Sequence, residues 1–146
     1  MVQKYGVGKN AAPDLFKLHA DEESMPSTIR VLLADDSREI RRLFRRAIDK
    51  MDDIEVVGEA CDGREAVEQA LGLRPDIVLM DIVMPNQDGI EATQQIALEA
   101  PEIHVIGLSM HNDARIQTAM LRAGAKAFVL KDEVFDKLHT TLRSVI

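Results

Sequence analysis

Short apolar runs that end in polar residues constrain the fold of this chain more than any other feature. Ile77-Val78-Leu79-Met80 leads directly into Asp81, and residues 29–34 lead into the pair Asp35-Asp36. Such runs, bounded by turn residues, are typical of strands buried on both faces, as in a parallel sheet. Because parallel strands need long crossover connections, we expect helices between them.

Five predicted strands alternate with five predicted helices from Ile29 onward. The strands cover residues 29–34, 54–60, 76–80, 103–108 and 126–130. The first helix is expected over residues 37–51 and the third over residues 89–99. The second runs from the cap Asp62 to just before Pro75, and the fourth from Asn112 or Asp113 to the left-handed cap Gly124. The fifth begins just after Asp132 and continues to the chain end. This order predicts a doubly wound α/β fold, with a mainly parallel five-stranded sheet covered on both faces.

Two of the predicted helices carry further signals. In the first, apolar residues are spaced for a single buried face: Ile40, Leu43, Phe44, Ala47, Ile48 and Met51. In the second, Asp62 is expected to be the N-cap, with Glu65 reaching back as in a capping box.

Composition narrows the classes of function. The 146 residues suit one domain, and the net charge of -7 argues against nucleic-acid binding by this chain itself. A solvated helix surface is the favoured interpretation of the basic cluster Arg38, Arg41, Arg42, Arg45 and Arg46.

Cys61 is the single cysteine, so no intrachain disulfide can form, and its place after a strand predicts a partly buried side chain. With no membrane-length apolar segment and no signal peptide in the sequence, we expect a cytoplasmic location.

Residues 1–28 fall outside the alternating pattern. They hold two glycines, two prolines and an acidic run, and they lack a consistent apolar period. We expect a flexible N-terminal extension over residues 1–28 and one folded domain over residues 29–146.

Polar side chains follow four of the predicted strands. Asp35 and Asp36 follow the first strand, Asp81 the third, Ser109 the fourth and Lys131 the fifth. In open parallel sheets, ligands bind outside the carboxyl ends of the strands, where the strand order reverses. Taken singly, each residue is better explained as a cap, a turn or a surface residue. Together, they predict a site at one edge of the sheet.

The chemistry of this set suits a cation and a phosphoryl group. Neighbouring carboxylates raise each other's pKa, and a divalent cation relieves their repulsion. Oxygen ligands without His or Cys favour Mg2+ over zinc. Lys131 can neutralise a phosphate oxygen and Ser109 can donate a hydrogen bond to another. Asp81 is then placed to be the nucleophile that forms an acyl phosphate.

From Arg30 to its end, the chain resembles the receiver domain of two-component response regulators. Its motifs are Val31-Leu32-Leu33-Ala34-Asp35-Asp36, Met80-Asp81-Ile82-Val83-Met84-Pro85, Leu108-Ser109-Met110 and Val129-Leu130-Lys131-Asp132. The stretches around Ser109 and Lys131 are most similar to the subgroup that carries a C-terminal helix-turn-helix DNA-binding domain. The resemblance implies a flavodoxin-like fold with strand order 2-1-3-4-5.

The resemblance also implies roles for individual residues. It assigns Asp81 as the phosphoacceptor. Mg2+ would be held by Asp36, Asp81 and the backbone carbonyl of Val83, with Asp35 acting directly or through a water molecule.

A switch is implied as well. Ser109 would move toward the phosphoryl group and Lys131 would pair with it. Phe128 stands at the aromatic switch position and would turn inward together with Ser109. The added phosphate charge would thereby bias a two-state output surface.

The implied partners are a sensor histidine kinase and, after phosphorylation, a second copy of the chain. The chain would catalyse only its own phosphoryl transfer and slow autodephosphorylation, and it would regulate transcription through a domain absent from the sequence. Whether this is a truncated receiver or a stand-alone one stays open. The alternatives are an aspartyl-nucleophile phosphatase, disfavoured because Val83 stands where such enzymes usually carry a second acid, and an interaction domain that is never phosphorylated.

Overall fold

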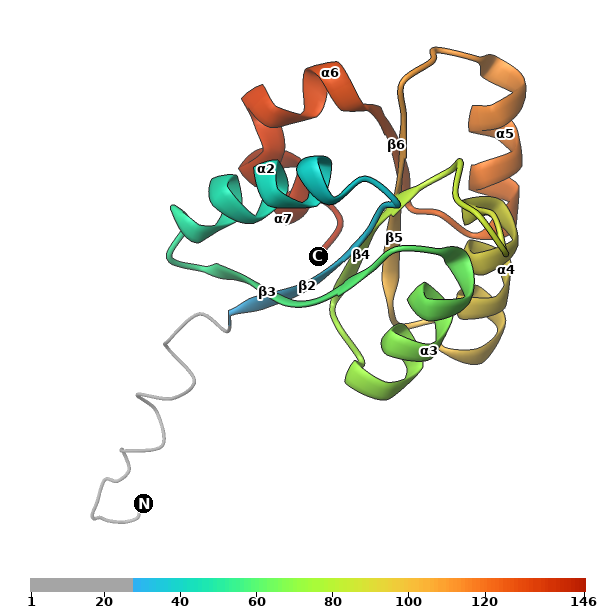
Figure 1. Ribbon diagram of the computed structural model, residues 1–146, viewed down its shortest axis with the longest axis horizontal. Helices are drawn as coiled ribbons and strands as arrows, with labels where there is room; N and C mark the ends of the chain where they lie inside the picture. The colour runs from blue at the N-terminus through green and yellow to red at the C-terminus, as the bar shows by residue number, and fades with distance from the viewer. Residues whose placement is uncertain (1–27) are drawn as a thin grey trace, which may run out of the picture.

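Five parallel strands form one sheet in the order β3-β2-β4-β5-β6, which is 2-1-3-4-5 in order of appearance and confirms the predicted fold (Figure 1). The computed structural model describes residues 28–146. The strands are β2 (Ile29–Ala34), β3 (Ile54–Ala60), β4 (Ile77–Asp81), β5 (His104–Ser109) and β6 (Ala127–Leu130). The chain leaves β2 toward β3 and returns to β4 on the other side of β2, so the strand order reverses between β2 and β4.

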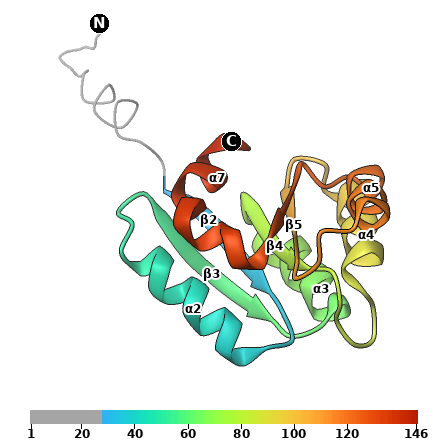
Figure 2. The same cartoon turned by 90° about the horizontal axis from the view of Figure 1, so that it is seen from above.

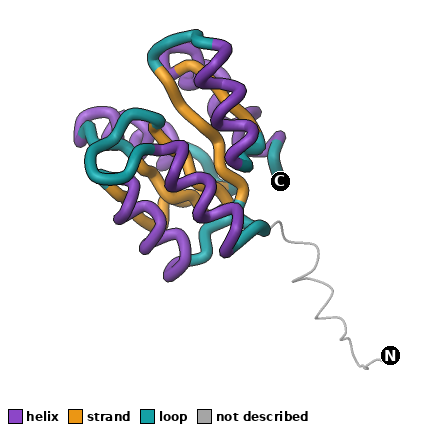
Figure 3. Tube along the Cα trace, turned by 90° about the vertical axis from the view of Figure 1, so that its right-hand side faces the viewer, coloured by secondary structure: helices purple, strands orange, loops and turns teal. Residues whose placement is uncertain are grey.

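Helices cover both faces of the sheet, as Figures 1 and 2 show. They are α2 (Arg38–Asp49), α3 (Gly63–Leu73), α4 (Gly89–Glu99), α5 (Ala114–Ala123), α6 (Lys131–Val134), the 3-10 helix η1 (Phe135–Lys137) and α7 (Leu138–Ser144). Residues of α2, α6 and α7 share one buried cluster, and residues of α3, α4 and α5 share another. The tube in Figure 3 shows the strands between these two helical layers. Within residues 28–146, no helix is both long and apolar enough to cross a bilayer.

Short polar residues begin four of the helices by accepting a backbone N–H. The N-caps Ser37, Asp62, Asp88 and Asp113 accept from residues two or three positions ahead at 2.8 to 3.2 Å. The predicted cap at Asp62 is confirmed, although the Glu65 carboxylate accepts from the Cys61 N–H at 2.7 Å. Gly124 ends α5 in the left-handed region, with φ +117, as predicted.

The C-terminal helix differs from the prediction. It begins at Lys131 itself, directly after β6, and is divided into α6, η1 and α7. Val134, Leu138 and Leu142 are buried in the core, and Val145 packs partly buried against it. A 3-10 turn between two short α-helices lets Phe135 stack on Phe44, with ring centroids 4.6 Å apart.

Two side chains lie elsewhere than expected. Leu43 was predicted on the buried face of α2, but it is 48% exposed, because Phe44 and Ile48 supply the inward stripe. Cys61 was predicted to be partly buried, but it is exposed beyond the end of β3. The proposed extension over residues 1–28 lies outside the described residues, apart from Thr28.

Phe44→Ala should destabilise the domain by about 3–5 kcal/mol, because it empties a fully buried site and removes the stacking partner of Phe135. Leu43→Ala, one residue earlier, should change the free energy of unfolding by less than about 1 kcal/mol. Urea unfolding followed by circular dichroism measures both. Equal losses for the two variants would contradict the orientation of α2.

Candidate functional site

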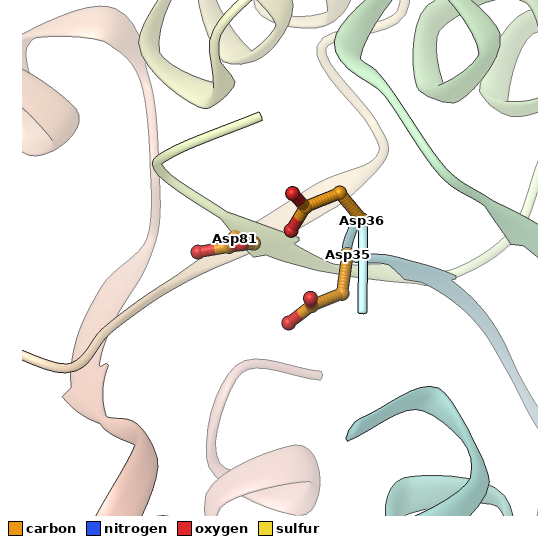
Figure 4. A group of neighbouring side chains, drawn as sticks. All are labelled: Asp35, Asp36 and Asp81. Atoms are coloured by element: carbon orange, nitrogen blue, oxygen red, sulfur yellow. The ribbon is translucent and has the colours of Figure 1, made fainter. Parts of the chain in front are cut away.

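Three carboxylates gather where the strand order reverses. Asp35 and Asp36 follow β2, and Asp81 is the last residue of β4, the neighbouring strand. One oxygen from each carboxylate lies within 4.8 Å of the other two. Figure 4 shows Asp35 and Asp36 turned to the side on which Asp81 lies. The sequence-based expectation of one shared edge is therefore met by these three residues.

A buried lysine completes the cluster from the far strand. The Lys131 Nζ lies 2.7 Å from Asp35 Oδ2 and 3.3 Å from Asp81 Oδ1. Burial of the ammonium disfavours its charge, but the bond from Lys131 to Asp35 and the charges of both carboxylates outweigh burial and raise the pKa of Lys131. The ion pairs thus hold together the ends of β2, β4 and β6.

The two adjacent aspartates have different environments. Both oxygens of Asp35 are engaged, since Oδ1 accepts from the Ser37 N–H at 2.8 Å and Oδ2 from Lys131. Asp36 is exposed, and within residues 28–146 its carboxylate has no hydrogen-bonding or ion-pair partner. Asp36 therefore has both oxygens free for a ligand, whereas each Asp35 oxygen already accepts one hydrogen bond.

Asp81 is only 6% exposed, and its charge is poorly stabilised. Burial, followed by the negative charge of Asp35, raises the pKa of Asp81 from 3.8 to about 6, although Lys131 acts in the opposite direction. The expected raised pKa is thus present, but loss of water contributes more than carboxylate repulsion. Asp81 Oδ1 also accepts from the Val83 N–H at 3.4 Å.

Ser109 shares a pocket of about 320 Å³ with Asp36, Asp81, Val83 and Lys131. Its hydroxyl is turned to its own loop, where it donates to the His111 carbonyl at 3.1 Å and accepts from the His111 N–H at 3.0 Å. Ser109 is therefore beside the carboxylates but already hydrogen-bonded.

Phe128 lies in β6 and is half-buried against the cluster formed by α3, α4 and α5. Its register partner on β5 is Gly107, two residues before Ser109. Because Gly107 has no side chain, the side chains of Phe128 and Met120 pack close to its backbone.

Sequence reasoning missed two groups that shape the site. Arg41 was interpreted as part of a solvated helix surface, but its guanidinium donates to the Asp35 carbonyl at 2.7 Å and to Glu59 at 2.8 Å. Gly89 was predicted only as the start of a helix, yet its N–H donates to the Ile82 carbonyl at 2.8 Å and a methyl group there would overlap the Asp81 backbone. The Arg41–Glu59 pair joins residues 18 apart, and the contacts with the Asp35, Ile82 and Asp81 backbone depend on how each loop folds back, so neither residue type announces them.

Comparison with known proteins agrees with this geometry. The model of the response regulator receiver domain matches residues 31–143. The chain belongs to this family. It is 40% identical over 116 residues to the transcriptional regulatory protein LiaR of Bacillus subtilis, covering 80% of this chain and 55% of that protein. It is 39% identical over 120 residues to the response regulator protein VraR of Staphylococcus aureus, covering 80% and 57%. The chain thus spans about half the length of these curated relatives.

Solved structures give the same answer for the fold. The response regulator domain of Thermotoga maritima CheB matches with a TM-score of 0.75 and 39% identity, covering 80% of this chain and 95% of that one. The receiver domain of the putative response regulator NarL from Mycobacterium tuberculosis matches with a TM-score of 0.78 and 30% identity, covering 82% and 97%. The predicted flavodoxin-like receiver fold is confirmed.

Asp81→Asn should stabilise the metal-free domain at neutral pH by about 1–3 kcal/mol. Between pH 3.8 and about 6, the folded state holds a proton on Asp81 that the unfolded state has released, so stability falls as the pH rises and the penalty is complete above about 6. Urea unfolding in EDTA at several pH values measures this, with the exposed Asp52→Asn as control. If Asp81→Asn were no more stable than the wild type at pH 7, the raised pKa would be wrong.

Proposed function

We propose that this receiver domain accepts a phosphoryl group on Asp81 from a sensor histidine kinase in a Mg2+-dependent reaction. The observation that carries the proposal is the buried, poorly stabilised Asp81 carboxylate, placed beside two further carboxylates and a buried lysine. A carboxylate with a raised pKa is more basic in its ionised form, and it is therefore a stronger nucleophile toward phosphorus. At neutral pH it is nevertheless mostly ionised, as the attack requires.

The oxygen donors fit Mg2+. We assign Asp36, Asp81 and the Val83 carbonyl as its ligands, with Asp35 acting through a water molecule, because both Asp35 oxygens already have protein partners. A bound Mg2+ would offset the carboxylate repulsion and the charge of the incoming phosphoryl oxygens.

The transfer itself is a displacement at phosphorus. An Asp81 oxygen forms the new P–O bond while the P–N bond to the kinase histidine breaks, and the imidazole nitrogen keeps the electron pair of the broken bond. Lys131, 3.3 Å from Asp81, is close enough to follow the charge onto the phosphoryl group. Ser109 would leave the His111 backbone to donate to a phosphoryl oxygen, and Phe128, now half-buried, would turn further inward with it.

Switching would then change the surface of α5, β6 and the C-terminal helices, and we expect the phosphorylated chain to form homodimers. Relatives named as transcriptional regulatory proteins support a role in transcription through a domain outside this chain. Reversal by slow autodephosphorylation and a cytoplasmic location, where the kinase would act, belong to the same proposal.

A phosphatase on the same architecture is less well supported. Such an enzyme needs an acid two residues after the nucleophile, and this chain has Val83 there, 74% exposed and apolar. An interaction domain without phosphorylation is also less well supported, because nothing in that role requires Lys131 to be buried between two carboxylates.

Acetyl phosphate and Mg2+ should add the mass of one phosphoryl group to the wild type and none to Asp81→Asn. Intact-mass spectrometry reads both, and Asp88→Asn, which keeps the α4 cap, serves as the matched carboxylate control. Equal labelling of wild type and Asp81→Asn would reject the assignment.

Asp36→Asn should weaken Mg2+ binding by about tenfold or more, whereas Ser109→Ala should leave it nearly unchanged. The carboxylate of Asp36 is a proposed ligand, but the hydroxyl of Ser109 would meet only the phosphoryl group. Isothermal titration with Mg2+ in the absence of phosphodonor distinguishes the two, and similar affinities for both variants would show that Asp36 is not a ligand.

A further inference from the structure

The loop that follows Asp81 is packed against the start of a different helix. Residues 82–88 connect β4 to α4 and carry Val83. At the far end of this loop, the Gln87 carbonyl lies directly over Gly63, the first residue of α3. A methyl group on Gly63 would overlap that carbonyl oxygen and lie 2.6 Å from the Gln87 carbonyl carbon. Gly63 therefore marks a close approach between the start of α3 and the loop over residues 82–88.

A side-chain hydrogen bond reinforces this contact. The Asn86 amide donates to Asp62 Oδ2 at 2.7 Å, while Asp62 Oδ1 caps α3 by accepting from the Glu65 N–H. Asn86 has φ 68, in the left-handed region that Asn tolerates better than most residues. Asp62 thus uses one oxygen for its own helix and the other for the loop after Asp81.

We infer that Asp62 and Gly63 position the loop over residues 82–88 and thereby tune the affinity of the acidic site for Mg2+. The inference deepens the proposed function and rests on it, because Val83 is the proposed carbonyl ligand. At its near end the loop is fixed by the Gly89 N–H, which donates to the Ile82 carbonyl. The contacts at Asp62 and Gly63 fix its far end, so Val83 lies between two anchored points.

The coupling has a physical basis in the packing of this region. A metal site loses affinity when the groups that orient its ligands are disturbed, typically by about 10- to 100-fold. Gly63 has no positive φ, so alanine fits its backbone conformation. The effect of a methyl group at this position would therefore come from displacement of Gln87, and not from backbone strain.

Gly63→Ala should weaken Mg2+ binding by about tenfold, measured by isothermal titration without phosphodonor. Hydrogen exchange of the amides in residues 83–88 should also become faster. Gly72→Ala is the matched control, because it lies in the same helix and a methyl group there meets nothing within 4 Å. It should leave both the Mg2+ affinity and the exchange of residues 83–88 unchanged.

A swapped pair keeps the test decisive if Gly63→Ala fails to fold. Asp62→Asn retains a good N-cap but removes the ionised oxygen that accepts from Asn86, so the loop contact falls to a neutral amide–amide hydrogen bond that forms only if the Asn86 amide turns over. Combining it with Asn86→Asp restores one donor and one acceptor in reversed order and keeps the net charge. The double variant should recover the Mg2+ affinity and amide protection that Asp62→Asn loses.

The outcomes separate this inference from the proposed function. Wild-type affinity in Gly63→Ala and Asp62→Asn would overturn the positioning role while leaving Mg2+ binding by the wild type intact. Loss in Asp62→Asn without recovery in the swapped pair would also overturn it. Absence of Mg2+ binding by the wild type would overturn the proposed function together with the inference that rests on it.

Discussion

A single buried ammonium group organises the functional edge of this domain. Lys131 is only 8% exposed and lies between Asp35 and Asp81, so it joins the ends of three strands, of which only β2 and β4 are neighbours in the sheet. Removing the ammonium would leave two buried carboxylates without their shared counter-ion, and a change of this kind typically costs about 3–5 kcal/mol. The same arrangement leaves Asp81 with a raised pKa, because one ammonium shared between two carboxylates does not offset the loss of water around Asp81. Stability at this edge is thus limited by the groups that the proposed chemistry needs.

The position of Lys131 also shapes the C-terminal helix. Lys131 is both the residue after β6 and the first residue of α6, so the chain turns into a helix while its side chain points into the site. Leu138 and Leu142 must still reach the core on the face covered by α2. The 3-10 turn of η1 lets α6 keep Lys131 in the site while α7 directs Leu138 and Leu142 into the core, and it places Phe135 against Phe44. The division of this helix follows from the site at its start and the core at its end.

Much of the fold could be predicted because its signals are local. Apolar runs mark buried strands, and Ser37, Asp62 and Asp113 announce helix starts through a hydrogen bond that spans only two or three residues. The strand-end residues of the site follow from the topology alone. The failures have a different origin. Leu43 obeys the helical period, yet its burial depends on how wide the buried face of α2 is. The contacts of Arg41 with Glu59 and of Gly63 with Gln87 depend on segments distant in the sequence.

The hydroxyl of Ser109 shows what switching would demand of this structure. It already makes two hydrogen bonds with the His111 backbone, one as donor and one as acceptor, so it gains little from moving unless the new acceptor is stronger. A charged phosphoryl oxygen is such an acceptor, because hydrogen bonds to ionised groups contribute about 1.5–3 kcal/mol against about 1 kcal/mol for neutral ones. Without phosphate that acceptor is absent, so the two bonds to His111 hold the hydroxyl in its resting position. With phosphate, the stronger bond and a shift of Lys131 toward the new charge together favour the other arrangement.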